Sequence, residues 1–108
     1  MSEERAWLAL VTFERKTDET DVLPQWAQGA CGWMVALGSD FEIAYQRLVR
    51  DLGHCALRIL EVADELEVFT PKDVEDTDEY LASNWREIEP GKHTVWGTLH
   101  SYKGEGEA

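Results

Sequence analysis

The chain has 108 residues, a length typical of one domain, and it carries 22 acidic against 10 basic residues, for a formal net charge of −12. Affinity for nucleic acids and anionic membranes rests largely on Lys and Arg, so this charge argues against both kinds of partner and favours a basic protein. Two cysteines, acids ahead of the first apolar run and no apolar stretch of ~20 residues predict a soluble cytoplasmic protein with reduced thiols.

The first half of the chain predicts two strands and a helix. Residues 6–14 (AWLALVTFE) and 30–37 (ACGWMVAL) are apolar runs of strand length. Ser39 and Glu42 form the S-x-x-E pattern of a capping box, and the apolar residues that follow recur at helical spacing. Gly53 favours the left-handed conformation that ends many helices. We therefore expect a helix that begins after Ser39 and ends at Gly53.

The second half predicts further strands and a second helix. Residues 55–62 and 66–69 are expected to be two strands joined by a turn at Asp64 and Glu65. A helix is expected from about Thr77 to Ile88, although Thr70 followed by Pro71 is also a plausible helix start.

The chain ends in a strand and a short tail. Residues 94–102 alternate in the manner of a strand, and residues 104–108 (GEGEA) are expected to be disordered, which leaves one domain over residues 1–103. The predicted order is then β-β-α-β-β-α-β. We therefore predict an α+β fold: a ferredoxin-like βαββαβ sandwich with an extra N-terminal strand, in which two helices cover one face of an antiparallel sheet.

The run QGACGW, from Gln28 to Trp33, is similar in part to the nucleophile signature of papain-like cysteine proteases. That signature places an aromatic residue directly after the cysteine, at the start of a helix. Here Cys31 is followed by Gly32, near the beginning of a predicted strand. We therefore interpret Cys31 as a structural thiol and assign no catalytic residue.

Five acids stand within the seven residues of DVEDTDE, from Asp73 to Glu79. The run lacks the central Gly of an EF-hand loop, so we assign no metal to it. Acids are favourable at helix N-termini, which makes a solvated helix start one interpretation and a contact patch for a basic partner the other. The predicted partner-binding residues are these acids and two nearby aromatic residues: Asp73, Glu75, Asp76, Asp78, Glu79, Tyr80 and Trp85.

An aromatic platform on the sheet is the alternative site. Strict alternation along residues 94–102 places three large side chains on one face of the last strand. Exposed aromatic patches usually mark interaction surfaces, unless the first strand or the long connection over residues 16–28 covers this face and makes it core. The alternative site is a ligand pocket formed by Trp33, Trp96, His100 and Tyr102.

From these features we expect a non-enzymatic acidic domain that binds a basic protein and needs no cofactor. A concrete form is an immunity or inhibitor-type protein that masks a basic toxin or nuclease, with Tyr80 and Trp85 as anchors within an acidic rim. The alternative is a ferredoxin-like small-molecule-binding or enzymatic domain that forms a homodimer through its sheet faces.

Overall fold

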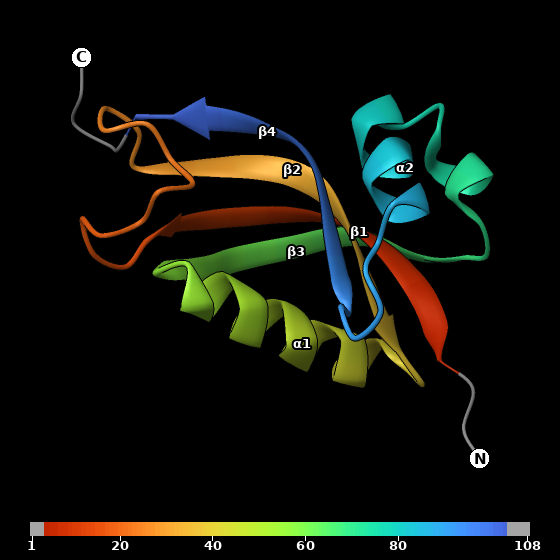
Figure 1. The fold of residues 1–108 in the computed structure, drawn as a ribbon. Coiled ribbons are helices and arrows are strands. Elements are labelled where there is room, and N and C mark those ends of the chain that lie inside the picture. The colour runs from red at the N-terminus through yellow and green to blue at the C-terminus, as the bar shows by residue number, and fades with distance from the viewer. Residues whose placement is uncertain (1–3, 104–108) are drawn as a thin grey trace.

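A computed structural model describes residues 4–103 (Figure 1). Its elements, in chain order, are β1 (Arg5–Arg15), β2 (Gly29–Gly38), α1 (Phe41–His54), β3 (Leu57–Val68), the 3₁₀ helix η1 (Pro71–Val74), α2 (Glu79–Arg86) and β4 (Thr94–Tyr102). The four strands form one antiparallel sheet in the order β3-β1-β2-β4. The predicted α+β class and antiparallel sheet are confirmed, and the order of elements broadly fits the ferredoxin-like prediction, though an extra strand is present. The tail expected to be disordered lies outside the described residues.

The region expected to hold two short strands is the single strand β3. Leu8 pairs with Leu66 and Leu10 pairs with Ala63, so the partner strand holds an extra residue opposite Ala9. Asp64 lies in this insertion and adopts the left-handed conformation, with φ of 54°. Because such a bulge bends a strand without reversing it, the prediction of separate strands at this point is wrong.

Both α-helices begin at an aspartate. Asp40 caps α1, because its Oδ1 accepts a hydrogen bond from the N–H of Ile43 at 2.9 Å, so the predicted capping box one residue earlier is wrong. Gly53 lies inside the last turn of α1, and Ala56 with φ of 59° makes the left-handed turn that follows. Asp78 caps α2 in the same way through the N–H of Leu81.

The segment expected to form one second helix divides into two. Thr70 and Pro71 begin η1, as the alternative helix start predicted. Residues 75–77 form turns, and α2 begins only at Glu79. The predicted apolar face of α2 is confirmed: Leu81 is buried, and Trp85 and Ile88 pack partly buried against the same core.

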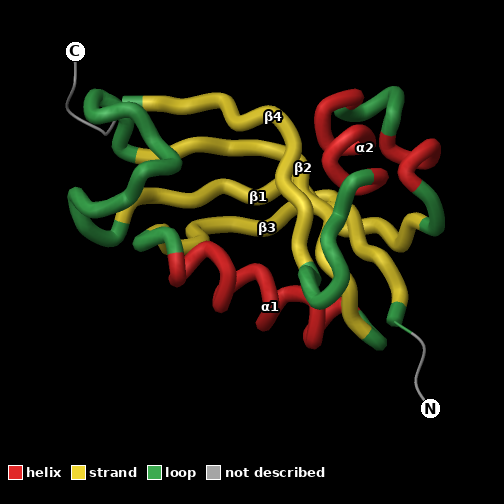
Figure 2. The backbone as a smooth tube through the Cα atoms, viewed as in Figure 1, coloured by secondary structure: helices red, strands yellow, loops and turns green. Residues whose placement is uncertain are grey.

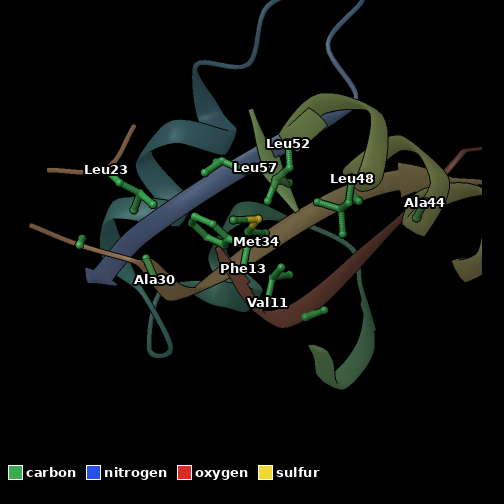
Figure 3. Packing of buried hydrophobic residues seen from close by; sticks show 12 residues of the cluster. Val11, Phe13, Leu23, Ala30, Met34, Ala44, Leu48, Leu52 and Leu57 are labelled. Atoms are coloured by element: carbon green, nitrogen blue, oxygen red, sulfur yellow. The ribbon is translucent and has the colours of Figure 1, made fainter. Parts of the chain in front are cut away.

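The two α-helices cover opposite faces of the sheet. Met34 belongs to the core that α1 closes, with Phe13 and Leu48 (Figure 3), whereas Val35 belongs to a second core closed by α2 with Leu81. Since consecutive residues of a strand point to opposite faces, these cores lie on the two sides of the sheet. Figure 1 shows α1 below the sheet and α2 above its right-hand end. The prediction that both helices cover one face is therefore wrong.

The long connection over residues 16–28 closes one end of the α1 core. Leu23 and Ala27 are buried in that core, while Trp26 is 57% exposed. The guanidinium of Arg15 fixes the connection, because it donates hydrogen bonds to the carbonyl oxygens of Ala27 at 2.9 Å and Pro24 at 2.8 Å. In Figure 2 this connection lies at the left end of the sheet, opposite η1 and α2.

Gly53 and Gly91 both have steric room for a side chain but differ in backbone conformation. A Cβ atom added to Gly53 or to Gly91 would meet nothing within 4 Å, but Gly91 has φ of +89°. We expect Gly53→Ala to stabilise the fold by up to about 1 kcal/mol through helix propensity. Gly91→Ala should destabilise the fold by roughly 1 kcal/mol through the left-handed penalty. Urea denaturation measures both, and effects of the same sign would contradict the described backbone.

Candidate functional site

Three of the five predicted partner-binding acids are engaged within the chain. Asp73 accepts two backbone hydrogen bonds at the start of η1. Glu75 forms an ion pair with Arg86 of α2. Asp78 is the N-cap of α2. Their carboxylates hold the segment in its conformation, and within the described residues only Glu75 of the three has its charge balanced by a cation.

Asp78 also joins α2 to the edge of the sheet. Its Oδ2 accepts a hydrogen bond from the backbone N–H of Thr98 at 2.8 Å, and its Oδ1 lies 3.3 Å from the Thr98 hydroxyl. A Cβ atom on Gly97 would collide with the Asp78 carboxylate and with Leu81, so the close approach of α2 to β4 requires glycine at this position. The sequence did not predict that Asp78 links α2 to β4, because the helix cap and the strand amide lie far apart along the chain.

The remaining predicted residues differ in their exposure. Asp76 and Glu79 are exposed and, within residues 4–103, their side chains make no hydrogen bond or ion pair. Tyr80 is 60% exposed beside them. We call Asp76, Glu79 and Tyr80 the η1–α2 surface. Trp85 packs partly buried against the second core, so most of its ring supports α2.

The predicted aromatic pocket does not gather in space. Gly32 pairs with Leu99 while Met34 pairs with Trp96, so β4 holds one extra residue at this point. An extra residue shifts the alternation of the strand that follows. Trp96 therefore lies on the α1 face, where it packs against the first core, whereas Trp33 packs against the second core.

His100 and Tyr102 lie beyond this bulge, on the face of Trp33. His100 is paired directly with Cys31 of β2, whose Sγ lies 3.5 Å from the Thr12 hydroxyl. The Tyr102 hydroxyl donates a hydrogen bond to the carbonyl oxygen of Phe13 at 3.2 Å. Burial, with Glu14 and Cys31 nearby, raises the pKa of Tyr102 above its usual value of 10.0, so this hydroxyl stays protonated near neutral pH.

A groove that the sequence did not predict lies along β4. It has a volume of about 1110 Å³ and runs between the end of α1, β4 and α2. We call it the β4 groove, and its lining includes Arg50, His54, Tyr80, Lys92, Trp96 and Leu99. These residues come from α1, α2, β4 and the loop that holds Lys92, which the chain brings together only on folding, so no spacing in the sequence marks them.

No family model, curated protein or solved structure matches this chain in the three comparisons made. Within residues 4–103, no three His, Cys, Asp or Glu side chains are grouped to hold a metal ion. None of the helices in that range has the length and apolar character needed to cross a membrane. The surface features described for this chain are therefore the η1–α2 surface, the sheet and the β4 groove.

Asp73 gives a prediction for pH dependence. The N–H groups of Phe69 at 2.8 Å and Thr70 at 2.9 Å hold the pKa of its carboxyl below the usual 3.8. Since the pKa is lower in the folded than in the unfolded chain, ionised Asp73 stabilises the fold above 3.8, and this contribution is lost as pH falls through the lower folded pKa. Asp73→Asn should therefore lower the free energy of unfolding at neutral pH, and the difference from the wild type should shrink with acidification below 3.8. Urea denaturation at a series of pH values measures it, and a difference independent of pH would contradict this role.

Proposed function

We propose that this chain is a non-enzymatic binding protein that contacts a basic protein through the η1–α2 surface. In its concrete form it is an immunity or inhibitor-type protein that masks a basic toxin or nuclease in the cytoplasm. The observation that carries the proposal is the exposure of Tyr80 and, within four residues of it along the chain, of two carboxylates, Asp76 and Glu79, that have no partner within the described residues. An aromatic anchor inside a charged rim is the usual composition of a binding hot spot.

The charge of the surrounding segment supports a basic partner. Between Glu61 and Glu89 the chain carries 11 acids against Lys72 and Arg86. A field of this sign attracts a basic protein over several ångströms and raises the rate of encounter more than the final affinity. The acids therefore account for the speed and selectivity of binding, and Tyr80 for much of its strength.

The acids engaged within the chain hold the η1–α2 surface in its conformation. The hydrogen bonds to Asp73 hold the start of η1, and the ion pair between Glu75 and Arg86 joins the end of η1 to α2. The cap at Asp78 fixes the first turn of α2, which carries Glu79 and Tyr80. A surface held in its bound conformation loses less entropy when it binds, so these contacts favour affinity.

The ligand-binding alternative has less support. Its four residues divide between the two faces of the sheet, because Trp96 packs with the first core and Trp33 with the second. A ferredoxin-like assignment adds nothing that decides between the alternatives, since such folds host many functions. Dimerisation through the face of Trp33, His100 and Tyr102 stays a prediction.

The test is a charge reversal with a matched control. The double substitution Asp76→Lys and Glu79→Lys changes the η1–α2 surface, and Asp18→Lys with Glu19→Lys makes the same change in net charge at the opposite end of the sheet (Figure 2). The tagged full chain is purified from its native host, and the basic protein that accompanies it is isolated. Association rates of that protein are then measured by stopped-flow fluorescence at low and high salt.

We expect the first pair of substitutions to slow association by about tenfold at low salt and to remove most of the salt dependence. The control pair should change the rate by much less. Tyr80→Ala should raise the dissociation constant by about 30-fold, as loss of a hot-spot residue does. Equal effects of the two double substitutions would show that only net charge matters and would exclude this surface.

A further inference from the structure

The β4 groove and the η1–α2 surface share Tyr80, so the two features are continuous. Tyr80 is 60% exposed in the first turn of α2, directly after Glu79, and it also lines the groove. Neither Asp76 nor Glu79 is among the described residues that line it. A partner that covers Tyr80 therefore lies over one wall of the groove. What the groove accepts from that partner rests on the proposed function.

The charges in the groove balance, in contrast to those of the segment beside it. Its lining holds Arg50 and Lys92 against Asp51 and Glu89. Arg50 and Asp51 form an ion pair, with Nε 3.0 Å from Oδ1, and Lys92 and Glu89 lie on one turn, closed by the hydrogen bond from the N–H of Lys92 to the carbonyl oxygen of Glu89 at 3.1 Å. The segment from Glu61 to Glu89, by comparison, has 11 acids against two basic residues. Basic groups of a partner are therefore attracted to the η1–α2 surface and not into the groove.

The floor and one wall of the groove offer apolar contact. Trp96 and Leu99 of β4 are partly buried against the first core, and Ile88 after α2 is partly buried against the second. All three also line the groove. Burial of a large apolar side chain against them removes apolar area from water and stabilises a complex. The volume of about 1110 Å³ has room for a side chain of the size of phenylalanine.

The outer edge of β4 is closed to a strand of the partner between Trp96 and Thr98. Asn84 donates a hydrogen bond to the carbonyl oxygen of Trp96 at 2.8 Å, and Asp78 accepts one from the N–H of Thr98 at 2.8 Å. Because these edge groups already have partners, a protein that enters the groove contacts it with side chains and not by strand addition.

From the shared residue, the balanced charges and the apolar floor, we infer that the β4 groove takes a large apolar side chain of the same basic partner. The partner then carries an apolar residue within its basic patch. This apolar side chain lies on Trp96 and Leu99 with Tyr80 at its side, while the basic groups face Asp76 and Glu79. A central apolar anchor inside a charged rim is how binding energy is usually distributed at protein interfaces.

Three short peptides, acetylated and amidated at their ends, test this inference without the natural partner. KKFKK carries the apolar side chain and the basic groups, KKSKK only the basic groups, and SSFSS only the apolar side chain. Each is titrated into the ¹⁵N-labelled full chain at low salt, and amide and indole resonances are followed by NMR. We expect KKFKK to bind with a dissociation constant of about 1 mM and to shift the Trp96 indole together with the amides of Asp76 and Glu79. KKSKK should bind about tenfold more weakly and shift the two acids alone, and SSFSS should be weaker than KKFKK by a similar factor.

Substitutions separate the groove from the acidic surface. Leu99→Ala should weaken KKFKK by about fivefold and leave KKSKK unchanged, and the unchanged binding of KKSKK shows that the variant is folded. Leu60→Ala, at a 52% exposed leucine of β3 outside the groove lining, should change the binding of neither peptide. Asp76→Lys with Glu79→Lys should weaken KKFKK and KKSKK alike.

Equal affinities of KKFKK and KKSKK, or shifts by KKFKK at Asp76 and Glu79 without a shift of the Trp96 indole, would overturn the inference and leave the proposed function intact. Groove binding that persists unchanged after the two acids are replaced by lysine would also overturn it, because the groove would then act independently of the acidic surface. So would the absence of any shift at about tenfold the expected dissociation constant. Failure of the proposed function is a separate result, namely equal effects of the two charge reversals on the association rate of the copurified protein.

Discussion

The carboxylate of Asp78 is the contact on which the arrangement of this domain depends. It caps the first turn of α2 through Leu81 and accepts the edge amide of Thr98, so one side chain fixes a helix to a strand. The contact is possible only because Gly97 leaves room for it. It holds α2 on the face opposite α1, and in doing so it gives the β4 groove its second wall and turns Glu79 and Tyr80 outward.

The bulge in β4 lies at the same place as the contact between Asp78 and Thr98. Gly97 and Thr98 together oppose Trp33, and Thr98 is the residue whose amide turns to Asp78. Beyond the bulge the alternation is shifted, which leaves Trp96 on the α1 face and His100 on the other. The bulge therefore lies where the Thr98 amide bonds to Asp78 of α2. It also separates the aromatic residues into two groups, one on each face of the sheet.

Much of the fold follows from local patterns in the sequence. The apolar runs predicted β1 and β2 to within one residue at each end, and residues 94–102 predicted β4 at its observed bounds. Bulges were not predictable in this way, because an alternating pattern does not record an inserted residue, and Asp64 and Glu65 suit a turn as well as a bulge. Adjacent Ser39 and Asp40 are both good caps, so composition alone could not choose between them.

The candidate sites also divide into features that the sequence predicted and features that it did not. The exposed acids and Tyr80 of the η1–α2 surface were predicted, since charge and composition are local properties. The internal roles of Asp73 and Asp78 and the whole β4 groove were missed, because they arise from contacts between elements distant in sequence. The acidic character of the chain is thus divided between carboxylates that support the fold and carboxylates that are free to meet a partner.

The most direct test of this account is amide hydrogen exchange at Thr98. Its N–H points away from β2 on an edge strand, where an amide without a partner exchanges fast, whereas the hydrogen bond to Asp78 predicts exchange slower by at least about tenfold. Asp78→Ala should remove this protection, and Asp76→Ala, which alters an exposed acid without a partner within the described residues, should preserve it. Fast exchange of the Thr98 amide in the wild type would contradict the central contact and the position of α2 that depends on it.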